Sequence, residues 1–233
     1  MNKEQFIQEL KNLEINITEK QLEQLEEYYE ILIEENNKYN LTTITEKTQV
    51  YLKHFYDSLC IVKIINLDNK YLLDIGTGAG FPGLVLKIVF PNLKIDLLDA
   101  TNKKCLFLQK VIDQLELKNI KVINARAEEY TKVNREKYDI VTSRAVAPLK
   151  HLLEYSVPAL KIHGEFVSLK GNIVEECKNI NNYYNKLCLE KEKTIVYELP
   201  YENSMRTLYK VTKTQKTPSI YPRAYSQIKK KDI

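Results

Sequence analysis

A glycine-rich turn that follows a short apolar segment is the feature that most restricts how this chain can fold. The apolar segment 71–75 contains Asp74, and the turn behind it reads Gly76-Thr77-Gly78-Ala79-Gly80. Glycines at this spacing let the backbone turn sharply and approach a ligand closely, where any Cβ would intrude. An amphipathic helix is expected from Gly83, and the first N–H groups of a helix have no partner within it. A buried parallel strand is joined to a helix in this way beside a nucleotide ligand.

The spacing of the glycines separates two families of cofactor-binding turns. The dinucleotide fingerprint has its third glycine three positions after the second, and here that position is Phe81. The Gly-x-Gly-x-Gly spacing, with Asp74 two residues ahead, resembles motif I of the class I S-adenosylmethionine-dependent methyltransferases. Asp99, at the end of the next apolar segment, is suited to accept hydrogen bonds from both hydroxyls of a ribose. The alternative is a glycine-rich loop with only a structural role.

Hydrophobic patterning after residue 70 alternates between strands and helices. Five strand–helix steps followed by two closely spaced strands are typical of the methyltransferase order, in which an antiparallel strand is inserted last. We therefore predict an α/β, Rossmann-like fold with a seven-stranded, mostly parallel sheet. Strands are expected at 71–75, 94–99, 119–123, 138–143, 165–169, 193–199 and 206–212, and helices at 83–90, 103–116, 149–161 and 173–188, with 124–137 and the chain beyond Lys213 irregular.

The residues before the glycine turn are predicted to form an N-terminal helical cap. Thr18 and Gln21 have the spacing of a capping box, so a helix is expected from Glu19 to Tyr39. Shorter helices are expected near 3–13 and from Thr45 onward. The predicted organisation is a helical cap over 1–66, a methyltransferase domain over 67–213 and a basic C-terminal tail over 214–233.

The charge of the chain is unevenly distributed. Residues 1–40 contain ten acids and four lysines, a net charge of −6, so the remainder carries +10 of an overall net charge of +4. A basic remainder suggests a polyanionic partner such as RNA, although a basic tail alone is often simply solvated. Arg223 and the run 229–231 are the tail cations expected to contact phosphates, and Tyr221 is the aromatic residue considered for base stacking.

Other features of the composition favour a cytoplasmic protein. No apolar run reaches the roughly 20 residues that cross a bilayer, and the polar, acidic N-terminus has no signal-peptide core. Four scattered cysteines form no Cys-x-x-Cys pair, which favours buried reduced thiols over disulfides or a zinc site. We expect no membrane contact, no metal and a monomer.

Four predicted strands end in polar residues. Ligands of doubly wound sheets lie at the carboxyl ends of the strands. Asp99 follows the second strand, and Ala127 and Glu128 follow the third, where a backbone N–H and a carboxylate are suited to the edge of an adenine. Arg144 follows the fourth strand, and Lys170-Gly171 the fifth. Any one of these is as readily an ordinary surface loop, but their common position indicates a site.

The sequence resembles the RsmG (GidB) family of bacterial methyltransferases, which modify a guanine N7 in small-subunit (16S) ribosomal RNA. The matching segments occur in the family's order along nearly the whole chain. They are His54-Phe55-Tyr56-Asp57-Ser58-Leu59, the segment 73–83, Leu98-Asp99-Ala100, Arg126-Ala127-Glu128, Ser143-Arg144-Ala145-Val146-Ala147, Leu169-Lys170-Gly171 and Tyr221-Pro222-Arg223. Two departures are Ala125, where the family usually has glycine, and the tail after Arg223, which lacks the usual glycine and proline.

The resemblance implies methyl transfer from S-adenosylmethionine to ribosomal RNA, alone or within the 30S particle. It places Gly76, Phe81, Ala127, Glu128 and Arg144 at the cofactor. The pattern of the glycine turn and of the next strand end adds two further cofactor-binding residues, Gly78 and Asp99. Guanine N7 carries a free lone pair, so no strong general base is required and no proton-transfer residue is named.

Two other readings remain open from the sequence. One is a class I methyltransferase that acts on a protein or a small molecule, which motif I and Asp99 do not exclude. The other is a non-catalytic RNA-binding module that retains the cofactor fold. His54 fits a site residue, although a lone histidine on a helix is more often structural.

Overall fold

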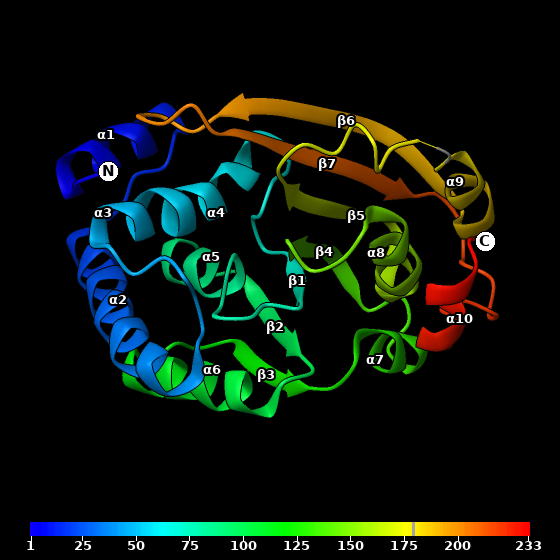
Figure 1. Ribbon diagram of the computed structural model, residues 1–233, viewed down its shortest axis with the longest axis horizontal. Coiled ribbons are helices and arrows are strands. Elements are labelled where there is room, and N and C mark those ends of the chain that lie inside the picture. Colours follow the sequence, from blue (N-terminus) through cyan, green and yellow to red (C-terminus); the bar gives the residue numbers. More distant parts are fainter. Residues whose placement is uncertain (179) are drawn as a thin grey trace.

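The computed structural model of the protein describes residues 1–178 and 180–233 and has three layers, with a central sheet between two layers of helices (Figure 1). The sheet has seven strands in the order β3-β2-β1-β4-β5-β7-β6. Their bounds are β1 Tyr71–Ile75, β2 Lys94–Asp99, β3 Ile120–Asn124, β4 Tyr138–Arg144, β5 Leu160–Lys170, β6 Leu189–Glu198 and β7 Met205–Lys213.

The first five strands are parallel, and β7 runs antiparallel between β5 and β6. Parallel strands covered on both faces are apolar on both faces, and β1 illustrates this: Leu72 packs into one hydrophobic cluster, while Leu73 and Ile75 pack into the other. The predicted fold class and the antiparallel final strand are confirmed.

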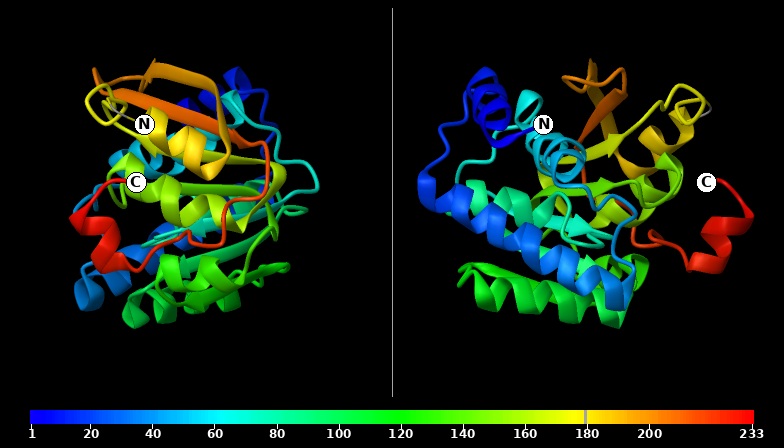
Figure 2. Two further views of the ribbon diagram at one scale, coloured as in Figure 1. Left: turned by 90° about the vertical axis from the view of Figure 1, so that its right-hand side faces the viewer. Right: turned by 60° about the vertical axis from the view of Figure 1, so that its left-hand side comes forward.

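Helices on one face of the sheet include the long N-terminal one. Figure 2 shows α2 running alongside α6, and the first hydrophobic cluster continues without a break from the N-terminal helices into the sheet. The helices of this face are α1 Lys3–Asn12, α2 Glu19–Tyr39, α3 Lys47–Val50, a π-helix Tyr51–Tyr56, α4 Asp57–Leu59, a 3₁₀ turn Cys60–Lys63, α5 Gly83–Val89 and α6 Asn102–Gln114.

The second face carries the later helices and the C-terminal segment. They are α7 Ala127–Val133, α8 Leu149–Ser156 with a 3₁₀ turn Val157–Ala159, α9 Asn181–Leu187 and α10 Tyr225–Lys230. In Figure 1, α10 (red) lies on this side of the molecule, next to α7.

Local sequence signals set several of these boundaries. Thr18 and Gln21 form the predicted capping box, and α2 has the expected bounds. Pro158 ends α8 early because a proline lacks the N–H that would continue the helix. No helix among the described residues is long and apolar enough to cross a bilayer.

Three expectations about elements were wrong. Segment 124–137 is not irregular, since α7 occupies 127–133, and the tail after Lys213 contains α10. Helix 173–188 is shortened to α9, because residues 174–178 form turns. Residue 179, which falls within the expected helix, lies outside the described residues. The capped helix expected near Thr45 is present: it begins at Lys47, and Glu46 accepts from the N–H groups of Thr48 and Gln49. All four cysteines are free, but only two of them, Cys60 and Cys105, are buried.

The N-terminal helices are bonded to the glycine turn and to the helix behind it. The buried hydroxyl of Tyr28 in α2 donates a hydrogen bond to the carbonyl of Ala79. The Gln21 amide donates to the last carbonyls of α5, Ile88 (3.1 Å) and Val89 (2.9 Å). These bonds cross the predicted boundary at residue 66, which remains a prediction.

The bond between Tyr28 and Ala79 makes a stability prediction. Tyr28→Phe leaves a buried carbonyl without its donor, so the free energy of unfolding should fall by about 1–3 kcal/mol in urea denaturation. The neighbouring Tyr29→Phe is the matched control, because the Tyr29 hydroxyl bonds Thr45 at an exposed position. Equal effects of the two substitutions would mean that the buried bond contributes nothing.

Candidate functional site

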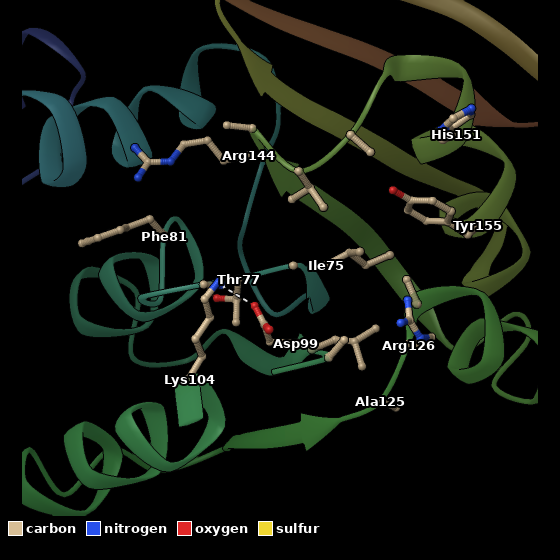
Figure 3. A pocket seen from close by; sticks show the side chains of 18 of the residues that line it. Ile75, Thr77, Phe81, Asp99, Lys104, Ala125, Arg126, Arg144, His151 and Tyr155 are labelled. Carbon is tan, nitrogen blue, oxygen red and sulfur yellow. Dashed lines mark hydrogen bonds between the residues drawn. The ribbon is translucent and has the colours of Figure 1, made fainter. Parts of the chain in front are cut away.

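A cavity of about 720 Å³ lies at the carboxyl ends of β1, β2, β3 and β4 and reaches α8 and α10 (Figure 3). Parallel strands that share one direction bring their following loops to one edge, so residues distant in sequence meet there. Among the residues that line the cavity are all seven of the predicted cofactor-binding residues, Gly76, Gly78, Phe81, Asp99, Ala127, Glu128 and Arg144.

The glycine turn forms the floor of the cavity. The N–H groups of Gly76 (2.7 Å) and Thr77 (3.2 Å) donate to the carbonyl of Leu98, which ties the turn to the neighbouring strand. Gly76 has φ +65°, and a Cβ there would lie 2.6 Å from Val146. At Gly78, also with positive φ, a Cβ would meet only one atom, at 3.9 Å. The backbone at Gly78 is therefore open to a ligand.

Asp99 lies against this turn with its carboxylate mostly buried. One oxygen accepts from the N–H of Gly78 (3.0 Å) and the other from the N–H of Thr101 (2.8 Å). Two N–H bonds leave lone pairs on both oxygens, since a carboxylate offers about four acceptor positions. Asp99 is thus oriented by the backbone and retains capacity for two hydroxyl donors.

Asp74 has a different role from Asp99. It is fully buried, and its carboxylate accepts from the N–H of Gly83 at 2.9 Å. The first N–H of α5 is therefore already hydrogen-bonded to a side chain of the protein. Burial raises the pKa of Asp74 to about 7. The acid ahead of the glycines fixes the turn to the helix and does not line the cavity.

The loop after β3 closes the cavity beside Asp99. The N–H of Ala125 donates to the carbonyl of Asp99 at 3.2 Å, and α7 begins at Ala127. Glu128, in the first turn of α7, is only 8% exposed and lines the cavity. A carboxylate is stabilised near the start of a helix. Arg126 precedes α7 and is exposed, so the acid lies deeper than the cation.

Arg144 is held by the N-terminal helices. Its Nη1 donates to the carbonyl of Lys53 (2.8 Å) and to the carboxylate of Asp57 (3.2 Å), and its Nη2 lies 3.0 Å from Nδ1 of His54. Figure 3 shows the guanidinium directed away from the middle of the cavity, above Phe81. Arg144 is therefore bonded within the protein through its guanidinium. It lines the cavity, but its charge is already paired.

His54 is locked in one tautomer by its partners. Arg144 has no acceptor, so Nδ1 of His54 accepts, and Nε2 carries the proton toward the Thr42 hydroxyl at 2.9 Å. Burial and the charge of Arg144 lower the pKa of His54 to about 3. The ring stacks on Phe81 with centroids 4.3 Å apart. His54 is therefore a neutral residue that joins Arg144 to the glycine turn.

Several cavity residues were not identified from the sequence. Tyr155 of α8 and Tyr225 of α10 gave no sequence signal because their position depends on how these helices pack. Lys170, which the sequence had grouped with the site, does not line the cavity: its amine bonds the Ala147 carbonyl (2.8 Å) and Glu176 (2.6 Å). Besides the seven, the polar and aromatic lining residues are Thr42, His54, Thr77, Lys104, Arg126, His151, Tyr155, Tyr225 and Lys229.

Two expectations about the tail are corrected. Tyr221 is 7% exposed and packs in the second hydrophobic cluster, so its ring is not available to stack on a base. Arg223 is not free for phosphates either. Its Nε and Nη2 each donate to Glu154 at 2.7 Å, and Glu154 is completely buried.

No cluster of three or more His, Cys, Asp or Glu side chains placed to hold a metal ion occurs among residues 1–178 and 180–233.

Comparison with known proteins gives one family. The sequence model described as "GidB: rRNA small subunit methyltransferase G" matches residues 21–206, which is more than half of the chain. The chain is 48% identical over 210 residues to the ribosomal RNA small subunit methyltransferase G of Mesoplasma florum, covering 89% of this chain and 88% of the relative. It is 42% identical over 233 residues to the protein of that name from Caldanaerobacter subterraneus subsp. tengcongensis, covering 99% of this chain and 98% of the relative.

Solved structures agree with the fold. A SAM-dependent methyltransferase from Aquifex aeolicus superposes with a TM-score of 0.55 at 15% identity, over 72% of this chain and 94% of that one. The YcgJ protein from Bacillus subtilis also gives 0.55, at 13% identity, over 70% of this chain and 100% of that one. At such identities the similarity concerns the fold.

The buried Asp74 predicts a pH-dependent stability. Because the pKa of Asp74 is raised in the folded state, the folded state binds this proton more tightly than the unfolded state does. Protonated Asp74 therefore adds its full contribution to the free energy of unfolding below pH 4, and this contribution is lost as the pH rises through 7. Between pH 5 and 8 the free energy of unfolding of the wild type should fall by about 2–3 kcal/mol relative to Asp74→Asn. Urea denaturation across this range measures the difference. Parallel curves would contradict it, and the exposed Asp113→Asn should run parallel to the wild type.

The bonds made by Arg144 lead to a prediction about stability. Arg144→Lys cannot reach Lys53, His54 and Asp57 together, so the free energy of unfolding should fall by about 1–3 kcal/mol. Arg144→Ala should cost more because it removes a charged partner of the buried Asp57. Arg126→Lys, at an exposed position, is the control in thermal or urea unfolding. An unchanged midpoint in both Arg144 variants would show that the pairing is not stabilising.

Proposed function

The chain belongs to the family of ribosomal RNA small subunit methyltransferase G, and we propose that it transfers a methyl group from S-adenosylmethionine to N7 of a guanine in 16S ribosomal RNA. The observation that carries this proposal is the cavity itself. It brings buried acids, an open glycine backbone and exposed cations to the carboxyl edge of one sheet. Such an arrangement suits a nucleoside cofactor within and a polyanion at the opening.

The residues present fit the cofactor. The open backbone at Gly78 gives room for close approach, and Asp99 has lone pairs left for two ribose hydroxyls. We assign Glu128 and the N–H groups at the start of α7 to the edge of an adenine, because both lie at the carboxyl end of β3. When bound, S-adenosylmethionine supplies a methyl group on a positively charged sulfur. The seven cofactor-binding residues named from the sequence stay in the proposal as ligand contacts.

The proposed nucleophile matches the chemistry of the lining. N7 of guanine has a lone pair that needs no deprotonation before it attacks. The imidazole beside the glycine turn, His54, uses both nitrogens in bonds to Arg144 and Thr42, so it has no free lone pair to serve as a base. The residues here act by orienting the reactants and excluding water.

We also propose that the substrate guanine is unpaired or turned out of its helix. The major groove of an RNA helix, where N7 lies, is too deep and narrow for side chains to enter. A base that enters a cavity at the sheet edge must leave its stack. We propose small-subunit ribosomal RNA or the 30S particle as the partner, the cytoplasm as the location, and a monomer without a metal as the active form.

The role proposed for Asp99 predicts that its substitution lowers the affinity for the cofactor. Asp99→Asn replaces one acceptor oxygen by an amide NH2 donor and removes the charge, so binding of S-adenosylmethionine should weaken by about 1.5–3 kcal/mol in calorimetry. Asp113→Asn, on the exposed face of α6, should bind like the wild type. Unchanged affinity in Asp99→Asn would remove Asp99 from the cofactor site.

The N7 assignment is tested on ribosomal RNA. Incubation of unmethylated 30S particles with the wild type and cofactor should produce one new site of N7-specific cleavage, mapped by primer extension. Gly76→Val should produce none, because the side chain collides with Val146 and occupies a backbone conformation unsuited to valine. Methylation of another atom, or of a protein or small molecule only, would overturn the proposal.

A further inference from the structure

The C-terminal helix α10 forms part of the wall of the cavity. Tyr225 and Lys229 are four residues apart, so they lie on the same face of the helix, and both line the cavity. Ile228 is buried in the second hydrophobic cluster. The tail therefore presents an aromatic ring and a cation toward the site and an apolar residue toward the core.

The position of α10 is fixed by buried charge and by carbonyl bonds ahead of it. Arg223, two residues before the helix, makes two side-chain bonds to the buried Glu154 of α8, and its N–H adds a third at 3.0 Å. Arg135 donates to the carbonyls of Tyr221 (2.6 Å) and Thr217 (2.5 Å). The segment that leads into α10 is thus docked on the domain.

The ring of Tyr225 has two cations near it. The Arg126 guanidinium is 5.4 Å from its centroid and the Lys229 amine 5.0 Å. Tyr225 is 39% exposed, and both Arg126 and Lys229 are exposed. Within the described part of the chain, neither cation has a carboxylate within ion-pair distance. An exposed ring flanked by unneutralised cations is the composition of single-stranded nucleic-acid sites, where bases stack and phosphates pair.

The charges distinguish this end of the cavity from the cofactor end. Asp99 and Glu128, which are mostly buried, face the interior, whereas Arg126 and Lys229 lie at the surface. S-adenosylmethionine has no phosphate and needs no pair of cations. An RNA strand brings a phosphate with every base.

We propose that Tyr225 is a stacking platform for a base next to the target guanine, and that Arg126 and Lys229 bind the adjoining phosphates of an unpaired RNA strand. This subsite rests on the proposed function and gives it a second contact, beyond the target base. It uses the tail after Arg223, where this chain departs from the family's usual sequence.

The test compares Tyr225→Ala with Tyr225→Phe in the full-length protein, using an unmethylated 16S ribosomal RNA fragment that contains the target site. Tyr225→Ala should weaken RNA binding by about 5- to 150-fold, which corresponds to the loss of one stacked base, and should raise KM more than it lowers kcat. Tyr225→Phe keeps the ring and should bind like the wild type. Tyr201→Ala, which removes an exposed ring elsewhere, is the matched control.

The cations have a separate readout. Arg126→Gln and Lys229→Gln should each flatten the dependence of log affinity on log salt by about 0.7, whereas Lys132→Gln, exposed on α7 but not at the cavity, should leave it unchanged. Unaltered RNA affinity in Tyr225→Ala would overturn the proposal. So would a loss of S-adenosylmethionine affinity with RNA binding intact, since α10 would then cover the cofactor instead.

The two proposals fail in different ways. A wild-type protein that methylates no guanine N7, but loses RNA affinity in Tyr225→Ala, overturns the proposed function and supports this subsite. If the wild type methylates N7 and Tyr225→Ala has the same KM as the wild type, the proposed function is supported and the subsite is overturned.

Discussion

The backbone reversal between β1 and α5 is the constraint on which the site depends. Gly76, Gly78 and Gly80 all have positive φ, and the turn they make is fixed at one end by the Leu98 carbonyl and at the other by Asp74. Because the turn lies flat against β2, Asp99 can accept directly from the Gly78 N–H. The cavity floor is therefore a product of backbone geometry, and among the three glycines the backbone is left open at Gly78.

The N-terminal helices are part of the same arrangement. Asp57, buried in α4, accepts from Arg144 and also from the Tyr197 hydroxyl at 2.9 Å, so β4, β6 and the N-terminal segment meet at one carboxylate. The π-helix from Tyr51 to Tyr56 presents His54 to Phe81 and to Arg144 at once. π-Helical turns are uncommon and often occur at functional sites. The N-terminal helices are thus in direct contact with residues of the cavity wall.

Much of the fold and the membership of the cavity could be predicted from the sequence, because both follow from local patterns. Apolar runs predicted the strands, and the capping box at Thr18 predicted the start of α2. Because parallel strands end at one edge of a sheet, the residues after them were expected to lie close together. The pairing of side chains could not be predicted in this way. Arg144 and Arg223 are cations in loops or at strand ends, and only tertiary contacts decide that they are bonded to Asp57 and Glu154. For the same reason Tyr221 is buried and Tyr225 exposed, although they are four residues apart.

The position of β7 has a consequence for the order in which the sheet is completed during synthesis. Among the described strands, β6 pairs in the sheet only with β7, and β7 also pairs with β5, yet β7 is the last of the seven strands in the sequence. Until then the nascent chain has an open edge at β5, and β6 has no neighbour to pair with. This side of the sheet cannot grow strand by strand along with the chain. The sheet is completed on this side only after β7 has been made and has paired with both β5 and β6.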